Sequence, residues 1–202
     1  MGLEEQLNMA LEKASNEREI DSFLKSHLEL IIELNEHSWN CVLKKSQFPI
    51  GTKFVADFIV LSACSGYWNC VLIEMQSHRD SIFTKKGEES AGLREARKQI
   101  TDWKMWIDEN EPAFREQLAV FAKDEAAQCN RPTHTKASTE LRDPKTCIFY
   151  KYKVLIGRRS FLDVERNKQR SCSSGFEIVT FDRLLDRARK IDDANDYLAK
   201  TK

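Results

Sequence analysis

The sequence carries no net charge, because its 202 residues contain 32 Lys and Arg against 32 Asp and Glu. A nucleic-acid-binding role cannot be inferred from such a balance and would require a local basic patch. The six cysteines form no Cys-x-x-Cys pair, so the spacing typical of structural zinc sites is absent. We expect reduced thiols in a cytoplasmic protein, because the start of the chain has no apolar segment that could direct secretion.

Segments that target or anchor a chain are also missing. The first residues, MGLEEQLNMALEKASNERE, are charged and contain no apolar core, so they do not predict a signal peptide. No apolar run approaches the roughly 18 residues of a membrane span, so we expect no membrane partner. Repeats, low-complexity tracts and long linkers are lacking as well, and the length suits a single domain over residues 1–202.

Apolar periodicity divides this domain into helices and strands. Two N-terminal helices occupy residues 1–35, and the second begins at Asn16 with Glu19 three residues later, the spacing of a capping box. Strands, a hairpin and a long helix fill residues 36–110, a polar loop follows at 128–145, and strands and helices complete residues 146–202. This order predicts an α/β fold with a mixed central β-sheet flanked by helices.

The expected elements can be bounded more closely. They are strands at 37–48, 147–156 and 176–180, the hairpin at 54–76, and helices at 3–14, 89–109, 114–123, 161–170 and from 180 or 182 to 198.

The hairpin, FVADFIVLSACSGYWNCVLIEMQ, carries three polar residues on its apolar runs: Asp57, Glu74 and Gln76. Strand side chains alternate between faces, so Glu74 and Gln76 share one face. A hairpin folded symmetrically about its turn at Ser62–Gly66 places Asp57 opposite Glu74, with Cβ atoms roughly 4.5–5.5 Å apart. Two carboxylates at that distance repel each other unless a cation lies between them, and a divalent metal meets this need.

Gln99 lies on the long helix in a row with Ala96, Trp103 and Trp106. A glutamine among tryptophans is either satisfied by structural hydrogen bonds or functional. A single acid near a strand end, such as Asp57, is commonly structural. The combination of Asp57, the Glu-x-Gln pair and a helix glutamine favours a catalytic site.

This combination resembles the PD-(D/E)xK nuclease superfamily, which places an Asp on one strand and a (D/E)xK pair on the next. Gln99-Ile100-Thr101-Asp102-Trp103 is similar to the QxxxY motif of several branches, with Trp in place of Tyr. The chain also resembles the Shedu family of bacterial anti-phage proteins over nearly its whole length. The resembling stretches are EREIDSFLKSHLEL, the hairpin, ARKQITDWKMWIDEN, VLIGRR and IVTFDRLL.

The resemblance implies a restriction-endonuclease-like core and a metal-dependent DNA endonuclease that nicks or cleaves DNA in defence against phage. Asp57 and Glu74 would bind Mg²⁺ or Mn²⁺, and Gln99 would brace these ligands or touch DNA. Gln76 replaces the lysine of the motif; it can orient a water molecule but carries no charge. An acid from the second helix often joins such sites, and Glu17, followed by Glu29, is the candidate.

Because Gln76 carries no charge, the positive charge at the site could come from residues outside its strand. The basic residues that follow the hairpin are Lys85, Lys86, Arg94, Arg97 and Lys98. Arg158 and Arg159 follow a predicted strand and are candidates for phosphate contacts together with Lys85 and Lys86.

Two other functions remain open from the sequence. A catalytically degenerate module could use the same fold, with Gln76 in place of lysine, to bind DNA or a partner protein. A structural or signalling subunit could use Trp68, Trp103 and Trp106 in an assembly interface. The resemblance implies a homo-oligomer. Because almost nothing precedes the predicted core, we expect a sensor or regulatory domain to be either missing or supplied by a separate partner.

Overall fold

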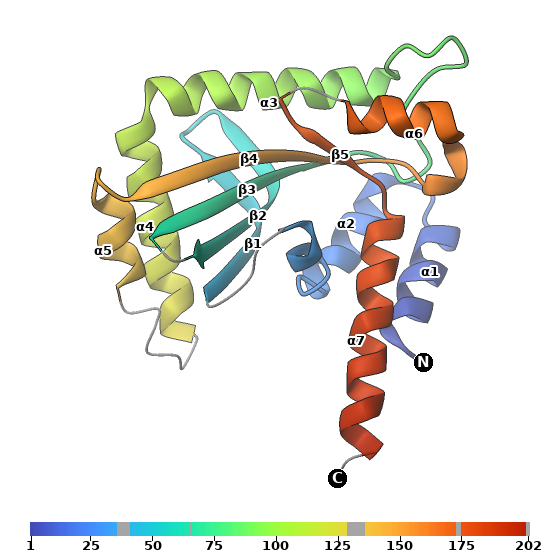
Figure 1. The fold of residues 1–202 in the computed structure, drawn as a ribbon, viewed down its shortest axis with the longest axis horizontal. Coiled ribbons are helices and arrows are strands. Elements are labelled where there is room, and N and C mark those ends of the chain that lie inside the picture. The colour runs from blue at the N-terminus through green and yellow to red at the C-terminus, as the bar shows by residue number, and fades with distance from the viewer. Residues whose placement is uncertain (36–40, 65, 129–135, 173–174, 201–202) are drawn as a thin grey trace. The chain divides into compact units, whose positions relative to one another are not determined.

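The computed structural model describes residues 1–35, 41–64, 66–128, 136–172 and 175–200. Its described strands form one mixed sheet in the order β1-β2-β3-β4-β5, flanked by helices (Figure 1). The predicted α/β fold class is confirmed, and this architecture is consistent with a nuclease-like core.

The chain forms two compact units, which we call the central and the terminal unit. The central unit comprises Asn35–Glu74 and Arg97–Lys153, and the terminal unit comprises Met1–Leu34, Met75–Ala96 and Val154–Lys202. The single domain expected from the sequence stays a prediction.

Three antiparallel strands form the core of the central unit: β1 (Cys41–Ile50), β2 (Phe54–Cys64) and β3 (Tyr67–Met75). The predicted turn at Ser62–Gly66 is too long, because Ser62 pairs with Asn69 and Cys64 with Tyr67. Backbone pairing continues until Gly66 reverses the chain at a φ of 85°. Residues 37–40 of the predicted first strand lie outside the described residues.

The β1–β2 turn is fixed to the helices of the same unit through Gly51. Gly51 has a φ of 62°, and a Cβ at this position would lie 2.3 Å from the ring of Trp106. The side chain of Gln117 holds the same backbone, accepting from Gly51 N at 3.0 Å and donating to Gly51 O at 3.4 Å. A glycine is therefore required here both for its conformation and for its size.

Helices α3 (Ala91–Glu109) and α4 (Glu111–Gln128) follow each other with a break at Asn110, as the sequence predicts. The helix expected at 114–123 is longer, since α4 begins at Glu111 and continues to Gln128. Phe114 of α4 is fully buried and contacts the rings of Phe48, Trp106 and Tyr150. This aromatic cluster anchors α4 against the strands of the central unit.

Part of the predicted polar loop at 128–145 is helical. Residues 129–135 lie outside the described structure, but Ala137–Arg142 form α5. Trp68 of β3 donates its Nε1 hydrogen to Glu140 of α5 at 3.2 Å, and Leu141 is fully buried. The sequence pattern missed this short helix because tertiary contacts, rather than its polar composition, stabilise it. Strand β4 (Cys147–Leu155) follows as predicted.

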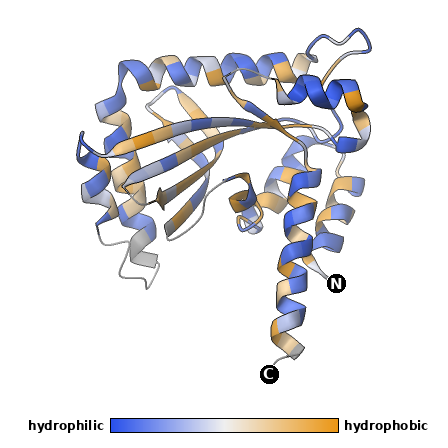
Figure 2. Ribbon diagram, in the orientation of Figure 1, coloured by the Kyte–Doolittle hydropathy of each residue, from blue (hydrophilic) through white to orange (hydrophobic). Residues whose placement is uncertain are grey.

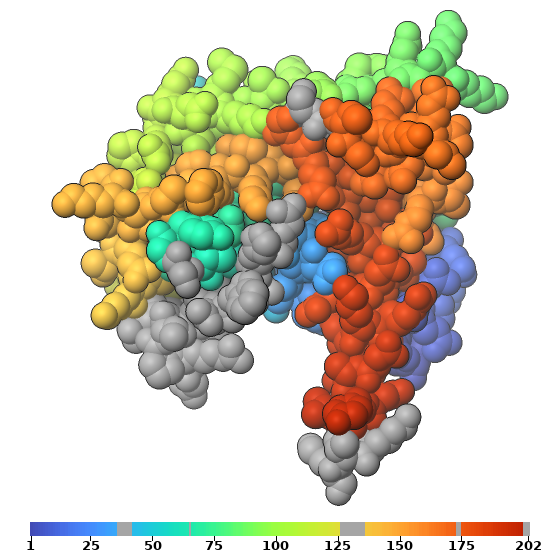
Figure 3. Space-filling model, in the orientation of Figure 1, coloured from blue at the N-terminus to red at the C-terminus, as the bar shows by residue number. Residues whose placement is uncertain are grey.

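The terminal unit contains the remaining elements. They are α1 (Leu3–Lys13), α2 (Glu17–Ser26), η1 (Ile31–Leu34), η3 (Arg159–Phe161), α6 (Val164–Ser171), β5 (Glu177–Val179) and α7 (Asp182–Lys200). Figure 2 shows α6 as largely hydrophilic, which agrees with its lack of buried residues. Helices α1 and α7 lie side by side (Figure 3).

Two helix N-termini in this unit are capped differently. The side chain of Asn16 accepts a hydrogen bond from Glu19 N at 3.2 Å, and Glu19 in turn accepts from Ser15 N at 3.0 Å, so the predicted local cap of α2 is confirmed. Helix α1 is instead capped from α7, because the Asp192 carboxylate accepts from Leu3 N at 2.8 Å and Glu4 N at 2.9 Å.

Candidate functional site

The β2–β3 hairpin brings the two predicted carboxylates to opposed positions. Phe58 pairs with Ile73 at the end of the paired register, and the next residues along the two strands are Asp57 and Glu74. The register therefore agrees with the one expected from the sequence. Side chains at opposed positions of antiparallel strands point to one face, with Cβ atoms roughly 4.5–5.5 Å apart.

Asp57 occupies the central strand of the three antiparallel strands, with β3 on one side and β1 on the other. It is half-buried, and its Oδ1 accepts a hydrogen bond from Gln47 Nε2 at 3.1 Å. Gln47 lies between the pairs Ser46–Phe58 and Phe48–Ala56 and has a φ of 51°. Neither the positive φ of Gln47 nor its hydrogen bond to Asp57 could be predicted from the sequence, because Gln47 lies in an ordinary strand pattern.

Glu74 is buried, with only 4% of its surface exposed. It shares its face of β3 with Leu72 and Cys70, both fully buried. Burial raises the pKa of the Cys70 thiol, which indicates an apolar surrounding on this face. Charges interact strongly in such surroundings, so a carboxylate there attracts a cation more strongly than one in water.

Gln99 is half-buried on α3, one turn before the buried Trp103. Residues 97–109 of α3 belong to the central unit, so Asp57, Glu74 and Gln99 all lie in the same compact unit. Later on the same helix, the Lys104 ammonium lies 4.8 Å from the centre of the Tyr152 ring on β4. The sequence singled out Gln99 but missed Lys104.

Arg97 and Lys98 also lie in the central unit, whereas the other predicted site residues belong to the terminal unit. Gln76 follows β3 directly and donates its backbone N–H to Leu155 O at 2.9 Å. The side-chain Oε1 of Gln76 lies near Gly92 in the first turn of α3, 3.2 Å from where a Cβ would be if Gly92 had one. The Asp80 carboxylate also lies near this position. Glu17 is the first residue of α2 and is half-buried, as is Glu29.

The basic candidates differ in their surroundings. Arg158 forms an ion pair with Asp182 at 3.3 Å, and Arg159 forms one with Asp186 at 2.8 Å. The hydrogen bond to Asp186 raises the pKa of Arg159. Lys85 and Lys86 are exposed. A phosphate contact by either arginine would compete with these carboxylates, so their role as DNA contacts stays a prediction.

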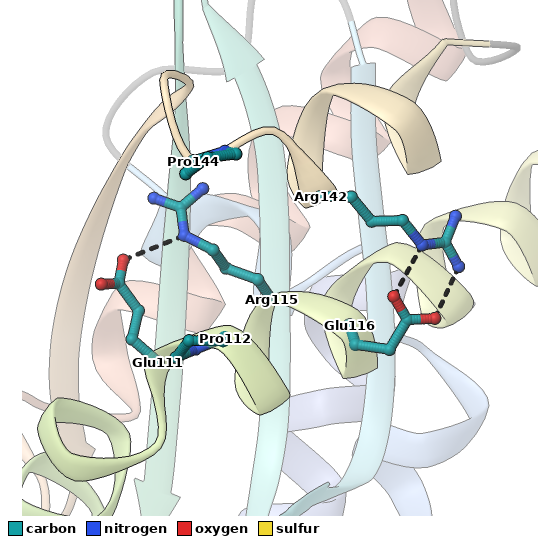
Figure 4. A pocket seen from close by; sticks show the side chains of 6 residues that line it. All are labelled: Glu111, Pro112, Arg115, Glu116, Arg142 and Pro144. Carbon is teal, nitrogen blue, oxygen red and sulfur yellow. Dashed lines mark hydrogen bonds and ion pairs between the residues drawn. The ribbon is translucent and has the colours of Figure 1, made fainter.

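A cleft between α4 and α5 does not involve these residues (Figure 4). Arg115 donates to Glu111 at 3.0 Å and to the carbonyl oxygens of Asp143 and Thr146, and Arg142 forms a two-bonded pair with Glu116. These guanidinium groups join α4 to α5 and to the start of β4, so they serve the fold of the central unit.

Within the described ranges, no group of three or more His, Cys, Asp or Glu side chains is arranged to bind a metal ion. A site built from Asp57 and Glu74 therefore has two protein carboxylates, and water and phosphate oxygens would complete its coordination. Among the helices that the structure describes, none has the length and hydrophobicity needed to cross a bilayer.

The fold and the hairpin define an α/β protein whose central sheet carries a pair of opposed carboxylates. The chain belongs to the Shedu family: residues 14–185 match the family model for the C-terminal part of the Shedu protein SduA. This membership suggests a role in anti-phage defence. No curated protein matches the chain.

Proposed function

We propose that this chain is a metal-dependent DNA endonuclease that acts in defence against phage. The observation that carries the proposal is the opposed placement of Asp57 and the buried Glu74 on the β2–β3 hairpin. Membership of the Shedu family and an architecture consistent with a nuclease-like core support it.

The donor atoms of this pair suit Mg²⁺ or Mn²⁺, which prefer carboxylate oxygen ligands. A carboxylate offers about four acceptor positions, so Asp57 can keep its hydrogen bond from Gln47 while it binds a metal ion. Gln47 would then fix the orientation of the Asp57 carboxylate, as partners of ligating carboxylates commonly do. When bound, the metal would supply charge neutralisation at the phosphate and acidify a water molecule.

The protein side chains would hold and orient the reactants. Asp57 and Glu74 would hold the metal ion and would thereby orient the scissile phosphate relative to the attacking water. Gln76, two residues after Glu74 in the sequence, would orient that water through its side-chain amide. Gln99 would brace the carboxylates or contact DNA, and Glu17 is the proposed additional acid.

Control of this activity is part of the proposal, because an ungated DNA endonuclease would damage its host. We propose that homo-oligomerisation or a separate sensor partner provides this control. Arg158, Arg159, Lys85 and Lys86 are the proposed contacts to DNA outside the carboxylate pair.

The test is cleavage of plasmid DNA by the purified protein with Mg²⁺ or Mn²⁺. Asp57→Asn and Glu74→Gln should each reduce the cleavage rate by about a hundredfold or more, since each removes a charge that acts in the transition state. Glu109→Gln, a change at an exposed acid that ends α3, is the matched control and should cleave as wild type does. Gln76→Lys should increase the rate if the missing charge limits it.

Absence of cleavage by the wild-type protein with either metal, on supercoiled, linear and nicked DNA, would refute the nuclease. DNA binding that persists and weakens with salt would then identify a binding module of the same fold.

A further inference from the structure

A cationic side chain lies over the sheet face that carries the two carboxylates. Strands β3 and β4 run in the same direction (Figure 1). On β3, Cys70, Leu72 and Glu74 share one face because side chains alternate. Asp57 joins this face through its opposed position in the hairpin.

Tyr150 and Tyr152 of β4 stand on the same face. Burial raises the pKa of both phenols, and the neighbouring Cys70 thiol acts in the same direction on each. In this parallel pair of strands, the hydrogen bond from Gln76 N to Leu155 O sets Tyr150 beside Cys70 and Tyr152 beside Leu72, so both tyrosines share the face of Cys70. Tyr152, which is 9% exposed, therefore belongs to the surface that also carries Glu74.

Helix α3 places Lys104 on this surface, with the ammonium 4.8 Å from the centre of the Tyr152 ring. The backbone N–H of Gln76 donates a hydrogen bond to the carbonyl oxygen of Leu155 and so links the ends of β3 and β4. Glu74 lies two residues before Gln76, and Tyr152 lies three residues before Leu155. With a rise of about 3.3 Å per residue and strands about 4.8 Å apart, the two residues occupy neighbouring positions. A phosphate held through a metal ion at the carboxylates would be within reach of the lysine side chain.

The electrostatics of Lys104 suit a phosphate contact. Burial lowers the pKa of its amine, and the positive charge of Arg97 acts in the same direction, against the opposing effect of Asp108. A partly desolvated ammonium gains more from an approaching anion than an exposed one does, because the effective dielectric is lower. Lys85 and Lys86 are exposed, so their ammonium groups stay fully hydrated.

We propose that Lys104 contacts the scissile phosphate that a metal ion at Asp57 and Glu74 would hold, and supplies the positive charge that Gln76 does not carry. This inference rests on the proposed nuclease function and identifies a catalytic residue for it. The ammonium donates hydrogen bonds to non-bridging phosphate oxygens and stabilises the charge that develops on them during cleavage. Lys104 lies on helix α3, whereas the lysine of the PD-(D/E)xK motif lies on a strand.

The experiment compares three variants in two assays. Lys104→Met keeps an unbranched side chain over Tyr152 and removes the charge, Lys104→Arg keeps the charge, and Lys123→Met at an exposed position of α4 is the control. Single-turnover cleavage in Mg²⁺ reports on catalysis. Fluorescence anisotropy of a short duplex with Ca²⁺ in place of Mg²⁺, over a salt series, reports on phosphate contacts.

Lys104→Met should lower the cleavage rate by about a hundredfold. It should also weaken duplex binding and reduce the salt slope by about one. Lys104→Arg should retain binding and part of the rate, while Lys123→Met behaves as wild type. Thermal unfolding of each variant confirms the fold.

Wild-type rates and affinities for Lys104→Met would overturn the inference. Should the wild type bind DNA without cleaving it, the nuclease proposal fails, and the binding assay alone decides whether Lys104 contacts a phosphate. A wild type that neither binds nor cleaves DNA refutes both.

Discussion

At the scale of single residues, the unusual feature of this protein is the number of polar groups on an otherwise apolar sheet face. Glu74 is 4% exposed, and Asp57 lies opposite it with a hydrogen bond from Gln47. Buried carboxylates are costly unless they gain partners, so a core selected for stability alone would not favour this pair. The proposed metal site would use the charge of both residues.

His78 is a second buried polar residue, 3% exposed and packed edge-on against Phe181 at 6.0 Å between ring centres. Burial lowers its pKa below the ordinary 6.5, and Arg79 and Arg158 act in the same direction, against Asp80 and the Leu11 backbone. The unfolded chain then binds a proton more readily than the folded one. Stability should therefore fall as the pH decreases through 6.5 and below.

The measurement is the free energy of unfolding in urea between about pH 5 and pH 8. His78→Phe keeps an aromatic ring against Phe181 without a titrating group, so its stability should depend less on pH in this range. An unchanged pH dependence in this variant would show that His78 does not cause the acid sensitivity.

At the scale of secondary-structure elements, local and remote interactions define the helix ends in different ways. Helix α2 is capped by its own sequence through Asn16 and Glu19, whereas α1 relies on Asp192, which lies far along the chain in α7. The hydrogen bonds from Glu4 N and Leu3 N lower the pKa of the Asp192 carboxyl. The two terminal helices therefore stabilise each other through a cap as well as through packing.

Replacing Asp192 should destabilise α1. We expect Asp192→Ala to reduce the free energy of unfolding by about 1 kcal/mol at neutral pH, the usual cost of losing a helix cap. Because the folded pKa of Asp192 is lowered, this contribution should disappear as the pH falls toward the pKa of the free carboxyl and below it. Asp193→Ala changes the exposed neighbour and should have little effect; equal losses in both variants would contradict the capping role.

At the scale of the whole molecule, the balance of 32 basic and 32 acidic residues means that DNA affinity has to arise locally. Arg158 and Arg159 already pair with Asp182 and Asp186. Lys104, Lys85 and Lys86, with a metal ion at the carboxylate pair, are therefore the proposed DNA contacts that do not have to displace either of these ion pairs.

Metal binding should be visible in the stability of the entire chain. At a free Mg²⁺ concentration about 100 times Kd, binding to the folded state alone adds about 2.7 kcal/mol. For a chain of this size, that gain raises Tm by roughly 5–10 °C. Differential scanning calorimetry should show this shift for the wild type and for Glu109→Gln, and its loss in Asp57→Asn and Glu74→Gln. An equal rise in Tm in all four proteins would show that the metal ion binds at a site other than Asp57 and Glu74.

Much of this protein was predictable from local patterns. Apolar periodicity located the long helix, the β4 strand and the hairpin, and the hairpin's symmetry placed Asp57 opposite Glu74, as the register shows. These features depend on residues close together in the chain, where side-chain alternation and turn geometry leave few alternatives. The acidic pair and its glutamine neighbours could therefore be proposed as a site from short-range patterns alone.

The tertiary structure decided what distant segments contribute. Helix α5 lies in a segment whose composition predicts a polar loop and depends on Trp68, and the cap of α1 depends on Asp192. Gln47 reaches Asp57 from a neighbouring strand, and Lys104 reaches Tyr152 from a helix. The sequence by itself determined the fold class and the carboxylate hairpin, because both follow from short-range periodicity. Only the packing of helices on strands decided which charges surround that hairpin, since such contacts join residues that no local pattern connects.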